Sequence, residues 1–133
     1  MRVRLIVVSA IAAALFVAPA FAHHSFAMFD ADKTVTLTGT VKEFEWTNPH
    51  AWLRIMVNDQ AAGKAVQYAL EMGSPGQQAR VGWKPDSVKP GDKVTVTIHP
   101  LKDGSRGGQF ITAMLPNGSI LGNGGQKPSA TGE

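Results

Sequence analysis

The chain has 133 residues, no Cys, and 13 Lys and Arg against 10 Asp and Glu. This length allows one small domain and excludes a multidomain enzyme, and the lack of Cys excludes a fold held by disulfides. Two basic residues, Arg2 and Arg4, precede an apolar run over 5–18 that leads into Ala20-Phe21-Ala22. This order is typical of a secretory signal peptide, so we expect residues 1–22 to be removed on export to the periplasm.

Removal of this segment changes the charge balance. Residues 1–22 contain two of the 13 basic residues and none of the acidic ones, so the remaining 111 residues carry a net charge of +1. Nucleic-acid binding needs clustered Lys and Arg to neutralise phosphates, which a near-neutral chain lacks. The apolar run is shorter than the roughly 20 residues that span a bilayer, and no later segment is apolar enough to do so. We therefore expect a soluble exported protein with no nucleic-acid partner and no membrane span after cleavage.

Alternating apolar residues predict five strands in the mature chain. The first alternation runs from Lys33 to Trp46, and its phase changes after Val41, which indicates a bulge or a sharp bend. Gly39, inside this strand, is where a coiled barrel strand could bend without a side-chain clash. The other four alternations lie at 51–57, 66–72, 94–98 and 109–115.

One short helix is predicted between the third and fourth strands. Ser74 is its expected N-cap, Pro75 its first residue, and Gln77 completes a capping box. Five strands with a helix in this position follow the order of an OB-type barrel, so we predict an all-β, five-stranded OB-like fold, with a β-sandwich as the alternative. The expected division is a signal peptide over 1–22, an N-terminal segment over 23–33, the barrel over 34–115 and a flexible Gly-rich tail over 116–133.

Histidine offers the strongest candidates for chemistry, and the chain has four, His23, His24, His50 and His99. Cleavage after Ala22 would make His23 the mature N-terminus, where its α-amine and imidazole can chelate one metal ion while another His supplies a third nitrogen. This histidine brace suits Cu(II), which heads the affinity order of divalent ions at nitrogen sites. Cleavage after Ala20 would instead leave Phe21-Ala22-His23, whose amine, two amides and imidazole also chelate Cu(II) or Ni(II).

The choice of the third nitrogen depends on the fold. In an OB barrel the end of the fourth strand lies near the beginning of the first, which favours His99 over His50. His50 follows the far end of the first strand, so we do not expect one ion to use both. Each His also has an ordinary interpretation, as a solvated residue after a cleavage site or a surface side chain at a strand end. The candidate auxiliary ligands are Met28, Asp30 and Glu71.

A second hypothesis is a metal-free binding module. Trp83 is expected to plug one end of the barrel, whereas Trp52, facing outward beside His50 and Arg54, is the best ligand-facing aromatic residue. Trp52 and Arg54 could then bind a small ligand or a partner protein. The chain has no nucleophile motif and no phosphate-binding Gly loop, so an enzyme is the less favoured class and a copper oxidase or monooxygenase ranks last.

Five short motifs together carry a family resemblance. They are His23–Phe26, Val35–Val41, Thr47–Ala51, Glu71–Pro75 and Val88–Asp92. In this combination the chain resembles the small exported bacterial proteins catalogued as domain of unknown function 6152, from residue 23 to about 118. The resemblance implies a periplasmic location, but it does not supply an activity. On the residues themselves, we expect a periplasmic Cu(II) carrier or buffer that uses its processed N-terminal His.

Overall fold

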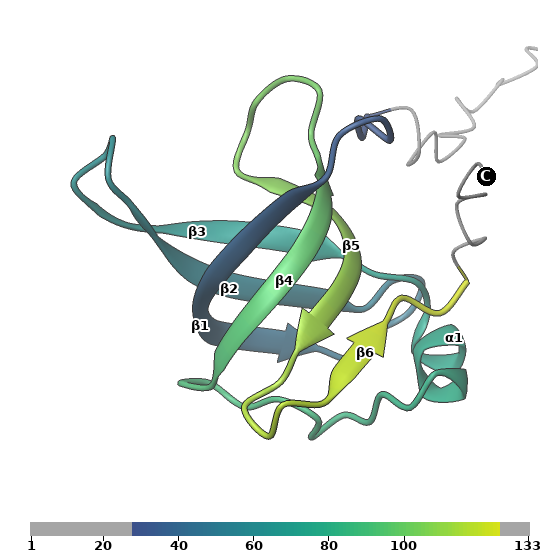
Figure 1. The fold of residues 1–133 in the computed structure, drawn as a ribbon. Coiled ribbons are helices and arrows are strands. Elements are labelled where there is room, and N and C mark those ends of the chain that lie inside the picture. The colour runs from purple at the N-terminus through teal and green to yellow at the C-terminus, as the bar shows by residue number, and fades with distance from the viewer. Residues whose placement is uncertain (1–27, 126–133) are drawn as a thin grey trace, which may run out of the picture.

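The computed structural model describes residues 28–125, so the expected signal peptide, His23 and His24 lie outside the described residues. Within 28–125 the chain forms strands and one short helix (Figure 1). In chain order these are β1 (Val35–Glu45), β2 (Trp52–Asp59), β3 (Lys64–Glu71), α1 (Pro75–Arg80), β4 (Lys93–Pro100), β5 (Gly107–Met114) and β6 (Ile120–Gly122). No helix in this part of the chain is both long and apolar enough to cross a membrane.

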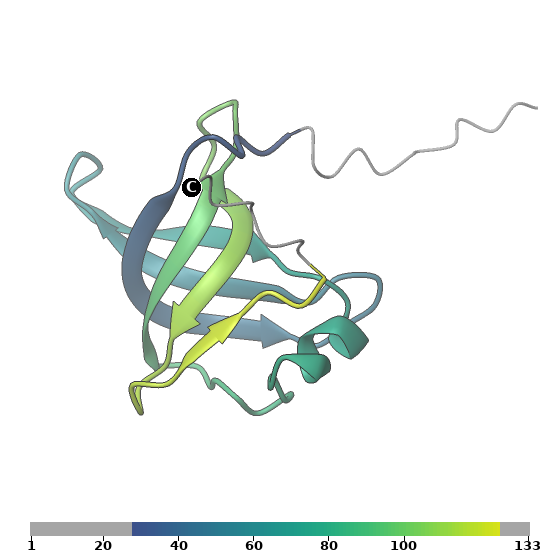
Figure 2. The same ribbon diagram turned by 45° about the vertical axis from the view of Figure 1, so that its right-hand side comes forward.

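The first five strands close into a barrel. β1 pairs antiparallel with both β2 and β4, while β2 pairs with β3 and β4 pairs with β5, also antiparallel. A parallel pairing of β3 with β5 completes the ring. Figures 1 and 2 show α1 at the opposite end of the barrel from the turn between β2 and β3. The predicted all-β class, five-stranded barrel and position of the single helix are confirmed.

β1 is long enough to belong to both halves of the barrel because it bends. Its register against β2 shifts between Val41 and Glu43, so the predicted bulge is confirmed. Bulges increase the local twist of a strand and bend it. At Gly39 the backbone of β2 approaches so closely that an added Cβ would lie 2.5 Å from the Met56 carbonyl oxygen. The absence of a side chain at Gly39 therefore allows β1 to pack against β2.

Substituting this glycine should separate β1 from β2. Gly39→Ala is expected to lower the free energy of unfolding by about 2 kcal/mol, because the new methyl group meets backbone that cannot move without breaking the sheet. Urea unfolding followed by circular dichroism measures this loss. The matched control is Gly76→Ala in α1, where an added Cβ has no neighbour within 4 Å. That change should be neutral or stabilise by up to about 1 kcal/mol, and equal losses in both variants would contradict the steric explanation.

The barrel interior is filled by the inward side chains that the alternation predicted. Ala51, Leu53 and Ile55 of the second alternation are fully buried. Trp83, 1% exposed, is the largest of the fully buried side chains in the described chain. Its ring lies 5.4 Å from that of Phe44 and 5.6 Å from that of Phe110. Trp83 thus joins the segment after α1 to the core.

The sequence signals at α1 match its structure. Ser74 is the N-cap and accepts a hydrogen bond from the Gln77 backbone N–H, while the Gln77 side chain accepts one from the Ser74 N–H at 3.0 Å. Pro75 occupies the first turn. The predicted N-cap and capping box are confirmed, and they fix where the chain turns after β3.

The segment after residue 116 differs from the expected flexible tail. Residues 120–122 form β6, which pairs antiparallel with β5, and Gly124 is buried. Glycine suggested flexibility, but here it allows close packing, because a Cβ on Gly124 would overlap the carbonyl of Gln77. The described part of this segment, through residue 125, belongs to the folded domain.

Candidate metal-binding pocket

A pocket of about 170 Å³ lies where the end of β3 leads into α1. Its wall combines the loop before β2, the β3–α1 connection, β5 and the segment after β6. The lining residues that carry side-chain nitrogen or oxygen atoms are His50, Glu71, Gln77, Gln109 and Asn123. The loop between β1 and β2, which carries His50, is one of the two loops through which OB barrels bind ligands. The pocket therefore has polar side chains in its wall and lies beside a loop that OB barrels use for binding.

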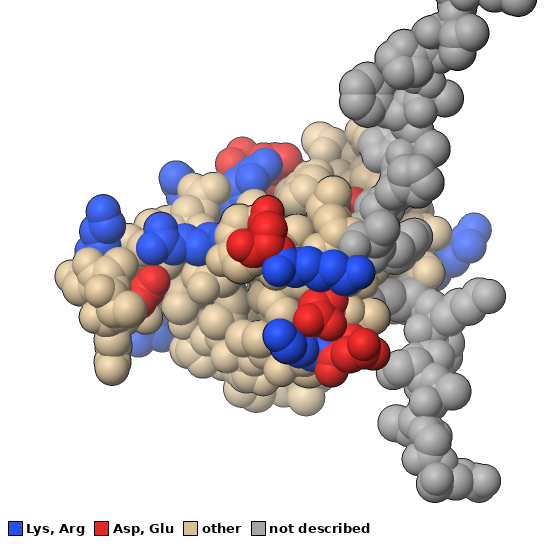
Figure 3. All heavy atoms as spheres, turned by 90° about the horizontal axis from the view of Figure 1, so that it is seen from above, with Lys and Arg blue, Asp and Glu red and all other residues tan. Residues whose placement is uncertain are grey.

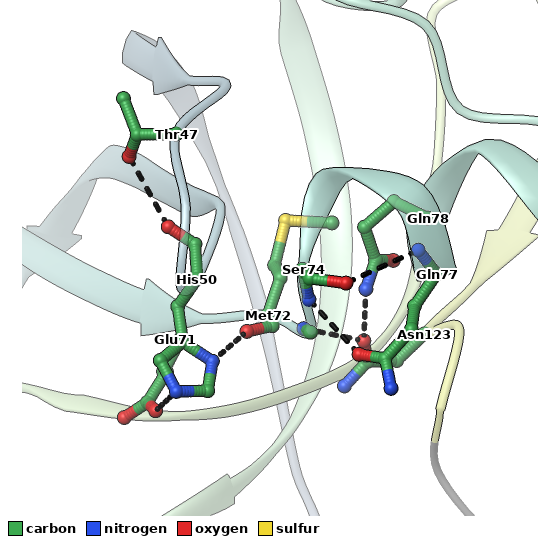
Figure 4. A network of polar contacts seen from close by, with 9 residues as sticks. Thr47, His50, Glu71, Met72, Ser74, Gln77, Gln78 and Asn123 are labelled. Carbon is green, nitrogen blue, oxygen red and sulfur yellow. Dashed lines mark hydrogen bonds and ion pairs between the residues drawn. The ribbon is translucent and has the colours of Figure 1, made fainter.

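His50 is held in one orientation by the backbone around it. Thr47 Oγ1 donates to the His50 carbonyl at 3.2 Å, and backbone hydrogen bonds of 3.0 Å tie Ala51 to Met72 and Gly73. The imidazole Nδ1 lies 2.9 Å from the Met72 carbonyl oxygen (Figure 4). Because a carbonyl oxygen only accepts, Nδ1 is the donor and carries a hydrogen. A backbone carbonyl that fixes the ring in this way is a common feature of metal-binding His.

The other ring nitrogen faces a carboxylate. His50 Nε2 lies 3.4 Å from Glu71 Oε1, with the two side chains 29% and 13% exposed (Figure 4). A neutral imidazole that donates through Nδ1 presents the lone pair of Nε2 on the side of the carboxylate. Two ligands at about 2.0 to 2.2 Å from one ion lie roughly 2.8 to 3.6 Å apart. The distance from His50 Nε2 to Glu71 Oε1 falls within this range.

His99 lies closer to this pair along the barrel wall than the sequence suggested. Glu71 pairs with Gln109, and Gln109 pairs with His99, so the three occupy adjacent positions on β3, β5 and β4. The parallel closure of β3 against β5 places the ends of β3 and β4 at the same side of the barrel, whereas we expected His50 and His99 to be separated by the length of a strand. His99 nevertheless does not line the pocket, and its Nδ1 lies 2.8 Å from the Lys33 carbonyl oxygen, to which it donates.

Of the three auxiliary candidates, Glu71 is the one that lines the pocket. Asp30 forms an ion pair of 3.6 Å with Lys33, and Met28 is 50% exposed. No sequence signal marked Phe29, which is 4% exposed and also lines the pocket. Phe29 forms a β-bridge with Leu101, so the chain passes the pocket wall just after the N-terminal His pair.

Trp52 and Arg54 form a separate cluster on the outer face of β1 and β2. The Arg54 guanidinium lies 5.6 Å from the centre of the Trp52 ring. Its Nε donates to Glu45 at 2.8 Å and lies 3.8 Å from Glu43. These two carboxylates offset the charge of Arg54, which weakens its attraction for an anionic ligand. The cluster does not line the pocket.

A buried amide network connects the pocket to the end of the folded chain. Asn123 Oδ1 accepts from the Gly73 N–H at 3.0 Å and from Gln78 Nε2 at 2.8 Å (Figure 4). Asn123 Nδ2 donates to the Phe110 carbonyl at 2.8 Å. Gln78 is fully buried, and its Oε1 accepts from the Gly124 N–H. The network fixes the turn next to Met72. No sequence signal marked Asn123, because it lies in a Gly-rich segment without apolar periodicity.

The charges around the barrel are mixed in sign. On the face shown in Figure 3, basic and acidic side chains are interspersed. In the loop before β5, hydrogen bonds from the Ser105 hydroxyl and N–H hold the pKa of Asp103 below its ordinary value.

Within residues 28–125, no three side chains of His, Asp or Glu come together as a complete metal site. His50 and Glu71 could supply two ligands, so a metal site here would need donors beyond these two side chains.

Comparison with known protein families identifies the family of this chain. A model described as a family of unknown function (DUF6152) matches residues 10–110. The chain belongs to this family. The DUF6152 match includes all four His and Glu71 but ends before β6 and Asn123. Searches of curated proteins and of solved structures found no match. Membership in DUF6152 assigns no activity, so a function has to be inferred from the residues.

Proposed function

We propose that this protein is an exported Cu(II) carrier or buffer of the periplasm, in which the processed N-terminus completes a site begun by His50 and Glu71. The observation that carries the proposal is the orientation of His50. Its Nδ1 donates to the Met72 carbonyl, and its Nε2 faces the carboxylate of Glu71 in a pocket. This arrangement prepares two ligands for one ion.

The N-terminal His pair would supply the missing donors. After cleavage behind Ala22, the α-amine and imidazole of His23 would join His50 and Glu71, giving three nitrogens and one carboxylate oxygen. Such a set suits Cu(II). Phe29 is in the pocket wall, and the six residue-to-residue steps from His23 to Phe29 can span up to about 20 Å. His50 takes the role that the sequence favoured for His99, because His50 lines the same pocket as Phe29.

Reversible loading is expected of a site that uses imidazole. A ligating imidazole nitrogen is deprotonated, so the metal affinity of a His site decreases on acidification. This property suits a buffer or carrier.

The test uses the protein exported by its own signal. Intact mass gives the mature N-terminus, and a Cu(II) titration followed by electron paramagnetic resonance gives stoichiometry and nitrogen ligation. We expect a start at His23 and one Cu(II) per chain. His50→Ala should weaken binding by about 100-fold or more, whereas His99→Ala should change it less than about threefold. The reverse order of these two effects would assign the third nitrogen to His99 and overturn the role of the pocket.

A second variant separates the proposal from its alternatives. His23→Ala combined with His24→Ala should abolish tight Cu(II) binding. A start at Phe21 together with Cu(II) binding that is insensitive to His50→Ala would instead indicate the three-residue chelate. If the mature protein does not bind Cu(II) tightly from either start, the metal proposal fails. The metal-free module built on Trp52 and Arg54 would then be the function to test.

A further inference from the structure

We propose that Asn117 is a site of spontaneous conversion to aspartate and isoaspartate in the folded protein, and that the fold protects Asn123 from the same reaction. Both residues precede glycine, in Asn117-Gly118 and Asn123-Gly124. Because glycine has no Cβ, its backbone nitrogen is open to the carbonyl carbon of the preceding side chain. The two sites therefore share one chemistry and differ in their surroundings. The reaction at Asn117 is independent of the proposed function.

The reaction needs water alone as a co-reactant. The Gly118 nitrogen attacks Cγ of Asn117 and closes a succinimide ring, while the bond from Cγ to Nδ2 breaks. Nδ2 leaves as ammonia with the proton of the Gly118 N–H. Water then opens the ring at one of its two carbonyl carbons. Opening at Cγ gives aspartate in a normal chain, and opening at the backbone carbonyl carbon gives isoaspartate, so either product gains a carboxylate.

Asn117 lies in the exposed turn that joins β5 to β6 (Figure 1). Its Oδ1 accepts hydrogen bonds from the Ser119 N–H at 2.9 Å and from the Ser119 hydroxyl at 2.6 Å. These donors stabilise the negative charge that develops on the oxygen during the attack. The attacking Gly118 N–H donates to the Leu115 carbonyl at 2.9 Å. This bond lies in an exposed turn, where local opening costs little.

Asn123 differs from Asn117 at both reacting nitrogens. Its Oδ1 also accepts two hydrogen bonds, from the Gly73 N–H and from Gln78 Nε2, so the carbonyl does not distinguish the two sites. The leaving nitrogen, Nδ2, donates to the Phe110 carbonyl at 2.8 Å. The attacking Gly124 N–H donates at 3.1 Å to Oε1 of Gln78, which is fully buried (Figure 4). Asn123 can therefore react only after this network opens.

The network sets the size of the protection. Three hydrogen bonds hold the Asn123 side chain, and at roughly fivefold each they favour the closed state by at least about 100-fold. In the unfolded chain both asparagines precede glycine without these contacts. Unfolding should therefore remove the difference between the two rates.

The isoaspartate product should loosen the β5–β6 hairpin. Its chain runs through Cβ and Cγ, which adds one backbone atom to the turn. The turn is closed by the bond from Gly118 to Leu115 and by one of 2.8 Å from the Leu115 N–H to the Ser119 carbonyl, and an added atom misaligns both. Asn117→Asp carries the same charge in a normal chain and is the matched reference. The isoaspartate form should unfold about 4 °C or more below Asn117→Asp in a thermal scan, and equal midpoints would overturn this effect on the hairpin.

The main experiment measures both rates on one peptide. The mature exported protein is incubated in mildly alkaline buffer, folded and in urea, and then digested with trypsin. The peptide that begins after Arg106 contains both asparagines, and its fragment masses assign each exchange of ammonia for water. In the folded protein we expect Asn117 to react at least about 100-fold faster than Asn123, with comparable rates in urea. Comparable rates in the folded protein, or reaction of Asn117 in urea alone, would overturn the proposal.

A variant tests the cause of the protection. Gln78→Ala removes a donor to Asn123 Oδ1 and the acceptor of the Gly124 N–H, so it should accelerate the reaction of Asn123 by about 10-fold or more. The rate at Asn117 should stay the same. Gln60→Ala, at an exposed residue of the turn between β2 and β3, is the matched control and should change neither rate. An unchanged Asn123 rate in Gln78→Ala, with the fold verified by circular dichroism, would overturn the protection by this network.

Discussion

Replacing Trp83 by Ala should lower the free energy of unfolding by about 4 kcal/mol. The indole ring is 1% exposed and packs edge-on against Phe110 and at a tilt against Phe44. Removing it leaves a cavity at the junction of the barrel and the segment after α1. The change also removes the hydrogen bond of 2.8 Å from Trp83 Nε1 to the Gly122 carbonyl, which holds β6. Urea unfolding of the mature protein, followed by far-ultraviolet circular dichroism, measures the loss.

Trp83→Phe separates the contribution of packing from that of the hydrogen bond. Phe retains an aromatic ring in the core but cannot donate to Gly122, so it should cost about 1 to 3 kcal/mol. If Trp83→Ala were no more destabilising than Trp83→Phe, the hydrogen bond to β6, and not the buried ring, would be the main contribution of this residue. A loss below about 1 kcal/mol in Trp83→Ala would contradict its place in the core.

The strands could be predicted because each has one face toward a single core. A period of two, as in Leu53 and Ile55 or Val94 and Val96, results directly from burial on one side of a sheet, and these four residues are buried. The bulge after Val41 was visible for the same reason, since an extra residue reverses the alternation. Helix α1 was visible through capping chemistry, which is local and depends on residue types at fixed spacing.

Long-range pairing could not be read from these signals. The parallel contact of β3 with β5 joins residues nearly 40 positions apart, such as Glu71 and Gln109, and periodicity does not specify which strand edges meet. This closure determines the neighbours of Glu71 and His99 in the barrel wall. All four His and Glu71 could be recognised as candidates from the sequence, but their neighbours could not. For this reason the sequence favoured His99, whereas the structure brings together His50 and Glu71.

The chain after residue 116 shows a second reason why structure could not be predicted from the sequence. Its five Gly residues and lack of apolar alternation suggested a tail, yet Asn123 and Gly124 are fixed by side-chain amides and by close backbone contact. Such contacts produce no periodic pattern of apolar residues in the sequence. Asn123 nonetheless connects the end of the folded chain to the turn that holds His50, so a residue outside the DUF6152 match bears on the proposed metal site.

Asn123→Ala should therefore lower both stability and Cu(II) affinity. The substitution leaves the Gly73 N–H and the Phe110 carbonyl without their side-chain partner and removes one partner of Gln78, for a loss of about 3 kcal/mol in the free energy of unfolding. Because Gly73 follows the residue whose carbonyl orients His50, a looser turn should weaken Cu(II) binding roughly 10-fold. Urea unfolding and Cu(II) titration of the same sample provide both values.

Asn117→Ala is the matched control, because Asn117 lies in the same C-terminal segment but, among residues 28–125, its side chain accepts hydrogen bonds from Ser119 of its own turn. It should cost less than about 1 kcal/mol and leave Cu(II) affinity unchanged. A stability loss in Asn123→Ala with unchanged Cu(II) affinity would show that Asn123 supports the fold alone, and that the orientation of His50 does not depend on the turn at Gly73.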